Sequence, residues 1–81
     1  MTDPAATLAA LCSRGPWRAG RHHTVTGEHV RAVYEAIASG DSHVAGMSHA
    51  AAQKSRMLLG SAGLIEYAGT PKRWRVAGGE S

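Results

Sequence analysis

Positively charged side chains gather in three short stretches of this 81-residue chain. The stretches are 14–21, 54–56 and 72–75, and together they hold eight of the nine Lys and Arg residues and no acidic residue. Seven of the nine are Arg, whose planar guanidinium group suits bidentate contacts with phosphate or guanine. If folding brings these stretches onto one face, they form a surface that attracts a nucleic-acid backbone, whereas scattered stretches would simply be solvated.

Residues that bind metals or act in catalysis lack the spacing that such chemistry needs. The five His residues and the lone Cys12 include neither a Cys-x-x-Cys nor a His-x-x-x-His pair, so a zinc site is not indicated. No nucleophile elbow around a serine and no Gly-x-x-x-x-Gly-Lys-Ser/Thr phosphate loop occurs. We therefore expect no metal, no cofactor and no enzymatic activity.

Length and composition limit the class of protein further. A chain of 81 residues is long enough for one domain, and 43% hydrophobic residues with a mean hydropathy of -0.22 are typical of a globular domain. No apolar stretch approaches the roughly 20 residues of a membrane span, and no secretion signal opens the chain. We expect a single cytoplasmic domain without a membrane partner.

A first helix is predicted over 4–13. Asp3 suits the cap, Pro4 suits the first helical position, and Leu8 and Leu11 follow at helical spacing. If these leucines find no core in their own chain, a second copy would cover them, so a homodimer through this helix is one alternative. Gly15 and Pro16 end this helix, and residues 17–23 show no clear period and are predicted to form a connector.

A second helix is predicted over 26–40, and it has the clearest apolar face. Thr26 suits its cap, Gly40 suits its end, and apolar side chains recur at helical spacing between them. These side chains are Val30, Val33, Tyr34 and Ile37. One or two helical turns are predicted over 41–47, where Asp41 or Ser42 can open a short segment.

A third long helix is predicted over 48–61, with Ser48 as its cap and Gly63 beyond its end. At about 100° per residue, small and aliphatic side chains fall on the side that should face the core. They are Ala51, Ser55, Leu58 and Ala62, with Leu59 at the margin. The opposite stripe carries His49, Gln53 and Arg56.

A β-hairpin is predicted over 64–77. Gly69 and Pro71 supply the turn, and the residues after it alternate with a period of two. Alternation places Trp74 and Val76 on one face of the hairpin and Arg73 and Arg75 on the other. The last residues, 78–81, are predicted to be a frayed tail.

The order of these elements resembles the winged helix-turn-helix family over 24–77. Four features carry the resemblance: helix 26–40, the capped helix 48–61, its Gly63-Leu64-Ile65-Glu66 exit, and the hairpin from Gly69 to Val76. It implies an α+β fold with a three-helix core and a C-terminal hairpin, the wing. Residues 1–23 would then add an extra N-terminal helix and a basic connector.

This resemblance implies sequence-specific binding of double-stranded DNA by a small transcriptional regulator. In the family the second helix of the motif enters the major groove, and the wing lies along the neighbouring backbone. Gln pairs with adenine edges, Arg pairs with guanine edges, and a helix start can hold a phosphate. The expected DNA-binding residues are Ser48, His49, Gln53, Lys54, Arg56, Thr70, Pro71, Lys72, Arg73, Trp74 and Arg75.

Two other functions remain open at this point. Pro71 and Trp74 make the wing similar to that of Z-alpha domains, which bind left-handed Z-DNA or Z-RNA. The Asn and Tyr that complete the site in that family correspond to Gln53 and Met57, or to positions near Ala52 and Arg56, so the similarity covers only the wing. The other alternative is a winged helix that serves as an adaptor or inhibitor and binds another protein.

Overall fold

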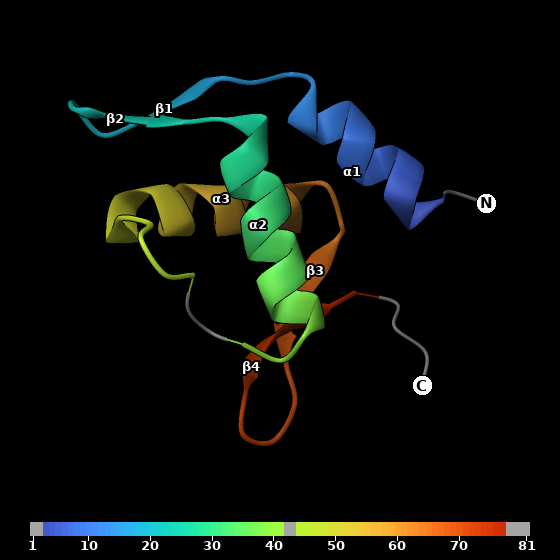
Figure 1. Cartoon of the computed structure of the whole chain (residues 1–81). Helices are drawn as coiled ribbons and strands as arrows, with labels where there is room; N and C mark the ends of the chain where they lie inside the picture. Colours follow the sequence, from blue (N-terminus) through green and yellow to red (C-terminus); the bar gives the residue numbers. More distant parts are fainter. Residues whose placement is uncertain (1–2, 42–43, 78–81) are drawn as a thin grey trace.

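A computed structural model describes residues 3–41 and 44–77, and in this part the chain is an α+β structure with three helices and two antiparallel hairpins (Figure 1). Its elements are α1 (Pro4–Cys12), β1 (Trp17–Ala19), β2 (His23–Val25), α2 (Gly27–Ala38), α3 (His49–Ser61), β3 (Ile65–Ala68) and β4 (Arg73–Val76). The α+β class is thus confirmed. The predicted tail 78–81 and Ser42 lie outside the described residues.

Helix α1 belongs to the core of the protein. The Asp3 carboxylate accepts a hydrogen bond from the Ala5 amide, and Pro4 occupies the first turn, as the sequence predicts. Leu8 and Leu11 are buried in the chain's own core, so they do not offer the apolar surface that a dimer through this helix requires. Helix α1 therefore contributes two side chains to the core of the described chain.

The start of α2 lies directly against the end of α1. A Cβ placed on Gly27 would come within 2.4 Å of the Cys12 carbonyl oxygen, so only glycine allows this approach. Thr26 caps α2 by accepting a hydrogen bond from the His29 amide, and His29 Nδ1 accepts from the Thr26 amide at 3.0 Å. His29 thus takes the place that Glu or Gln usually holds in a capping box.

The connector predicted at 17–23 is in fact part of a hairpin. Strands β1 and β2 pair with Trp17 opposite Val25 and Ala19 opposite His23. Ala19 and Val25 are buried, Trp17 is half-buried, and the hairpin packs against α3. Sequence periodicity missed these strands because each has only three residues, too few for alternation to appear.

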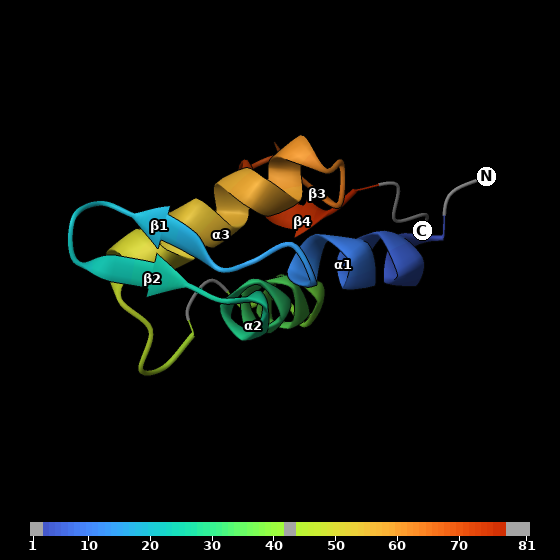
Figure 2. The same ribbon diagram turned by 90° about the horizontal axis from the view of Figure 1, so that it is seen from above.

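The segment between α2 and α3 contains no helix at residues 41 and 44–47, where one or two helical turns were predicted. It forms a turn in which the Met47 amide donates to the Val44 carbonyl at 3.3 Å. The three helices that pack together are therefore α1, α2 and α3, with α2 lying across α3 (Figures 1 and 2).

Helix α3 is capped as predicted, because Ser48 Oγ accepts a hydrogen bond from the Ala51 amide. Its buried face differs by one position: Ala51, Ser55 and Leu59 are buried, Leu58 is half-buried, and Ala62 is exposed. Ser55 has no exposed surface, and its hydroxyl donates to the Ala51 carbonyl at 2.8 Å. That bond satisfies the one polar group on this face.

The end of α3 leads into the second hairpin through a Schellman motif. The Gly63 amide donates to the Gly60 carbonyl, the Leu64 amide donates to the Leu59 carbonyl, and Gly63 has a φ of 77°. Leu59 and Leu64 are both buried, so the turn is fixed by an apolar contact as well as by hydrogen bonds. This explains why Gly-Leu-Ile marks the exit of the helix.

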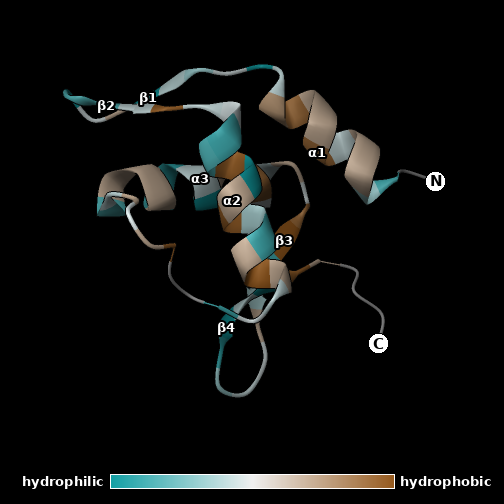
Figure 3. Ribbon diagram, viewed as in Figure 1, coloured by the Kyte–Doolittle hydropathy of each residue, from teal (hydrophilic) through white to brown (hydrophobic). Residues whose placement is uncertain are grey.

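The two hairpins lie toward opposite ends of α3. Hairpin β1–β2 lies beside the N-terminal part of α3, while β3 follows its C-terminal end (Figures 1 and 2). In Figure 3 the tip of β1–β2 and part of β4 are coloured as hydrophilic residues, whereas β3 begins with hydrophobic residues. The fold therefore presents two polar hairpin tips, one on each side of the helix.

Candidate nucleic-acid interface

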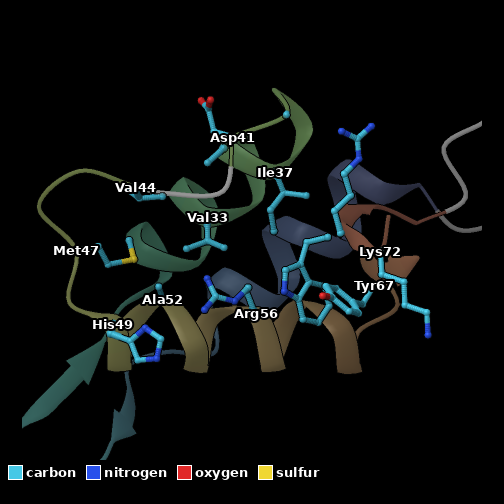
Figure 4. A pocket seen from close by; sticks show the side chains of 14 residues that line it. Val33, Ile37, Asp41, Val44, Met47, His49, Ala52, Arg56, Tyr67 and Lys72 are labelled. Atoms are coloured by element: carbon cyan, nitrogen blue, oxygen red, sulfur yellow. The ribbon is translucent and has the colours of Figure 1, made fainter. Parts of the chain in front are cut away.

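A hollow of about 590 Å³ lies between α2, the segment before α3, α3 itself and the β3–β4 hairpin (Figure 4). It brings together residues that the sequence analysis selected from two separate stretches. They are His49 and Arg56 of α3 with Lys72, Arg73 and Trp74 of the hairpin. The polar edge of the helix and the cationic end of the hairpin thus border one hollow.

Gln53, Arg56 and Lys54 lie differently on α3. Gln53 is exposed on the helix and does not line the hollow, whereas Arg56 is half-buried and extends into it. Lys54 and Arg56 are two residues apart, so they lie about 160° apart around the helix axis. Lys54 therefore belongs to the other flank of α3 and does not share the hollow with Arg56, although the sequence analysis grouped them.

Ser48 is already engaged in the fold, because its hydroxyl oxygen caps α3. The hydroxyl hydrogen remains available to a ligand, since a serine oxygen accepts and donates at the same time. The residues at the turn of the hairpin, Thr70 and Pro71, are exposed. These three residues lie on the surface around the hollow without lining it.

Trp74 pairs with an aromatic residue that the sequence analysis did not select. Its indole ring lies 5.1 Å from the ring of Tyr67, centre to centre, at an angle of 54°. Tyr67 is 56% exposed and Trp74 is 38% exposed, so neither ring is folded into the core. Tyr67 lies directly opposite Trp74 in the hairpin, a pairing that becomes visible only once the register is known.

The cations of the hairpin differ in their partners. Arg75 Nε donates to Glu66 Oε2 at 2.7 Å, so a carboxylate partly neutralises the Arg75 charge. Lys72 and Arg73 are exposed and make no salt bridge within the described residues. Both are thus available to an external anion, whereas Arg75 must first give up its bond to Glu66. Trp74 contacts Tyr67 and Arg75 contacts Glu66, so Trp74 and Arg75 lie on opposite faces of the hairpin as predicted. Arg73 and Trp74, which were predicted on opposite faces, both border the hollow.

The β1–β2 hairpin carries a second basic surface. Arg18, Arg21, His22 and His23 are all exposed there, and no acidic residue occurs anywhere from 4 to 27. The charge of this cluster is visible in the sequence, but no predicted helix or strand contained these residues. The hairpin now supplies that element and holds the cluster beside the N-terminal part of α3.

The described residues contain neither a cluster of metal-binding side chains nor a helix that could span a membrane. No group of three or more His, Cys, Asp and Glu side chains within 3–41 and 44–77 is placed to hold a metal ion. In the same part of the chain, no helix has the length and apolar character needed to cross a bilayer.

In comparisons with known proteins, no family model, no curated protein and no solved structure matches this chain.

Proposed function

We propose that this chain is a winged helix-turn-helix protein that binds double-stranded DNA, with α3 in the major groove and the β3–β4 hairpin as the wing on the backbone. The order α2, turn, α3 and hairpin supports this, together with the packing of α2 on α3. The observation that carries the proposal is the shared hollow: His49 and Arg56 border the same space as Lys72 and Arg73. A helix and a wing must face one side to bind one duplex.

In this arrangement the exposed side of α3 reads bases. Gln53 is exposed there and can make two hydrogen bonds to adenine, while His49 lies one turn earlier on the same side. Arg56 borders the hollow on the wing side of the helix, where it can contact guanine or the backbone. Ser48 at the helix start is placed to donate to a phosphate.

The wing contributes affinity that does not depend on sequence. Lys72 and Arg73 have no salt bridge in the described part of the chain, so binding a phosphate costs them no existing partner. Arg75 would contribute less, because it must first leave Glu66. A small regulator of transcription is the role that such a module would serve.

The proposal is tested by anisotropy titrations with a random duplex at two salt concentrations. We expect Arg73→Ala to weaken binding to every duplex and to reduce the slope of log affinity against log salt by about 0.9. Arg31→Ala is the matched control, because Arg31 is exposed on α2 and does not line the hollow. Equal effects of the two variants would contradict the proposed interface.

Base reading by α3 is tested with a set of duplexes that differ at single positions. Gln53→Ala should change the preference at about one position, at a cost of roughly 1 to 3 kcal/mol there. A uniform loss across all duplexes would assign Gln53 to backbone contacts. If no duplex binds at about 50 mM salt, where the electrostatic attraction is strong, the DNA-binding proposal is wrong and the alternative of a protein-binding adaptor is favoured.

One observation favours a second candidate, the binding of left-handed duplexes. The Z-alpha resemblance lacked an aromatic partner for Trp74 on the helix, and Tyr67 supplies one from β3. Circular dichroism of an alternating CG duplex tests this directly. Inversion of its long-wavelength bands on addition of the protein would support left-handed binding, and unchanged bands would remove that candidate.

A further inference from the structure

The hollow beside α3 has features that contacts with an intact duplex do not use. Its volume of about 590 Å³ lies within the range of about 300 to 1,000 Å³ that is usual for small-ligand sites. Val33 and Ile37 of α2 and Met47 before α3 give it an apolar wall (Figure 4). A groove-binding helix needs an exposed polar face, not a hollow of this size with an apolar wall.

Aromatic and charged groups line the other side of the hollow. Tyr67 and Trp74 are tilted by 54° and are partly exposed, so ring surface remains open for a further planar group. Arg56 extends into the hollow between the apolar wall and Tyr67 (Figure 4). Open aromatic rings lie beside cations that make no salt bridge within residues 3–41 and 44–77, and this combination fits a flat apolar group that carries an anion.

We propose that this hollow binds one unpaired nucleobase together with its phosphate, so that the protein prefers DNA in which a base is unpaired. This inference rests on the proposed function, because the same face must hold the neighbouring duplex. A base inside an intact duplex must first be unstacked and unpaired before it can enter, whereas an unpaired base does not bear that cost. An unpaired base can stack on Trp74 or Tyr67 while its phosphate meets the cations.

Charge fixes the orientation of this nucleotide. Asp41 is the one carboxylate among the described residues that line the hollow, and it lies on the α2 side. Lys72 and Arg73 lie on the hairpin side and have no salt bridge among those residues. The phosphate therefore lies toward Lys72 and Arg73, and the base extends toward α2, where Asp41 would repel a phosphate.

The test compares three DNAs of one sequence by anisotropy: a blunt duplex, the duplex with one unpaired thymine at an end, and the same overhang with an abasic nucleotide. We expect the unpaired thymine to raise affinity about tenfold over the blunt duplex, and the abasic overhang to lose most of that gain. Equal affinity for the thymine and abasic overhangs would overturn the proposal, because phosphate alone would then explain the binding.

Variants of Trp74 locate the effect. Trp74→Leu should bring the affinity for the thymine overhang down to that for the blunt duplex. Trp74→Phe should keep most of the difference in affinity, because Phe retains a ring for stacking. Circular dichroism melts of both variants check that they fold. A ratio unchanged in a folded Trp74→Leu and in a folded Tyr67→Leu would overturn the assignment to this hollow.

Failure of this inference differs from failure of the proposed function. If all three DNAs bind equally, the duplex interface stands and the nucleobase site is wrong. If none binds at about 50 mM salt, both proposals are wrong. In that case, binding of an acidic peptide that contains tryptophan would identify a protein segment as the occupant of the hollow.

Discussion

The β1–β2 and β3–β4 hairpins carry similar charge on opposite sides of α3, yet they are joined to the core in different ways. Both strands of β1–β2 contribute a buried residue, Ala19 from β1 and Val25 from β2. In β3–β4 only β3 contributes a buried residue, Ile65, and β4 is exposed except at Val76, which is half-buried. One hairpin is part of the core with a basic tip, and the other projects from it.

The tryptophans of the two hairpins differ in the same way, one held in the core and one open to a ligand. Trp17 of β1 packs against the core, whereas Trp74 of β4 borders the open hollow. The projecting hairpin therefore has side chains available to a ligand from its tip to the Tyr67–Trp74 pair, but not at its base, where Ile65 is buried. Buried side chains hold a strand in place, and exposed side chains bind a ligand. Hairpin β1–β2 has more of the buried side chains, and hairpin β3–β4 has more of the exposed ones.

The largest expected effect is on the free energy of unfolding, and it should differ between the two hairpins. Val25→Ala should lower the free energy of unfolding by about 2 to 3 kcal/mol, because Val25 is fully buried and its loss leaves a cavity. Val76→Ala should cost less than about 1 kcal/mol, since Val76 is only half-buried. Urea denaturation of both variants measures the difference. Equal losses would mean that both hairpins are equally part of the core.

The second effect is on DNA affinity. Replacing Lys72 and Arg73 together by Ala should reduce the salt slope by about 2, because each cation neutralises about one phosphate. Replacing Arg18 and Arg21 together should reduce it by less than about 1, since only β3–β4 borders the hollow with Arg56. Equal reductions in titrations over several salt concentrations would show that both hairpins bind the backbone.

The smallest effect concerns the ion pair on the wing. Glu66→Ala should lower the free energy of unfolding by less than about 1 kcal/mol, because the pair with Arg75 is exposed to solvent. It should also raise DNA affinity, since Arg75 then has no carboxylate partner to leave. Glu35→Ala is the control, because it removes the same charge from an exposed position on α2 that does not line the hollow. An equal rise in both variants would reflect net charge alone.

Sequence patterns predicted the longer elements because their signals are local. Asp3, Thr26 and Ser48 each cap the helix that the sequence assigns to them, and the spacing of Val30, Val33 and Ile37 predicted the buried face of α2. The hairpin after α3 was predicted from its turn residues and alternation. Each of these signals lies within one element, so no tertiary information was needed.

The parts that were missed depend on contacts between elements. The β1–β2 strands are recognisable only once Trp17 is paired with Val25, and the aromatic partner of Trp74 only once the register puts Tyr67 opposite it. The Glu66–Arg75 ion pair has the same origin. Leu59 rather than Leu58 lies at the centre of the α3 core face because the positions of α2 and β2 decide which side is covered.

The most direct test of the proposed interface is an NMR titration of the protein with a short duplex, read as changes in the backbone amide signals. We expect the largest changes at Gln53, Arg56 and the segment 72–74, with little change at the exposed residues of α1. Changes centred on α1, or none along α3 and the β3–β4 hairpin while the duplex is bound, would contradict it.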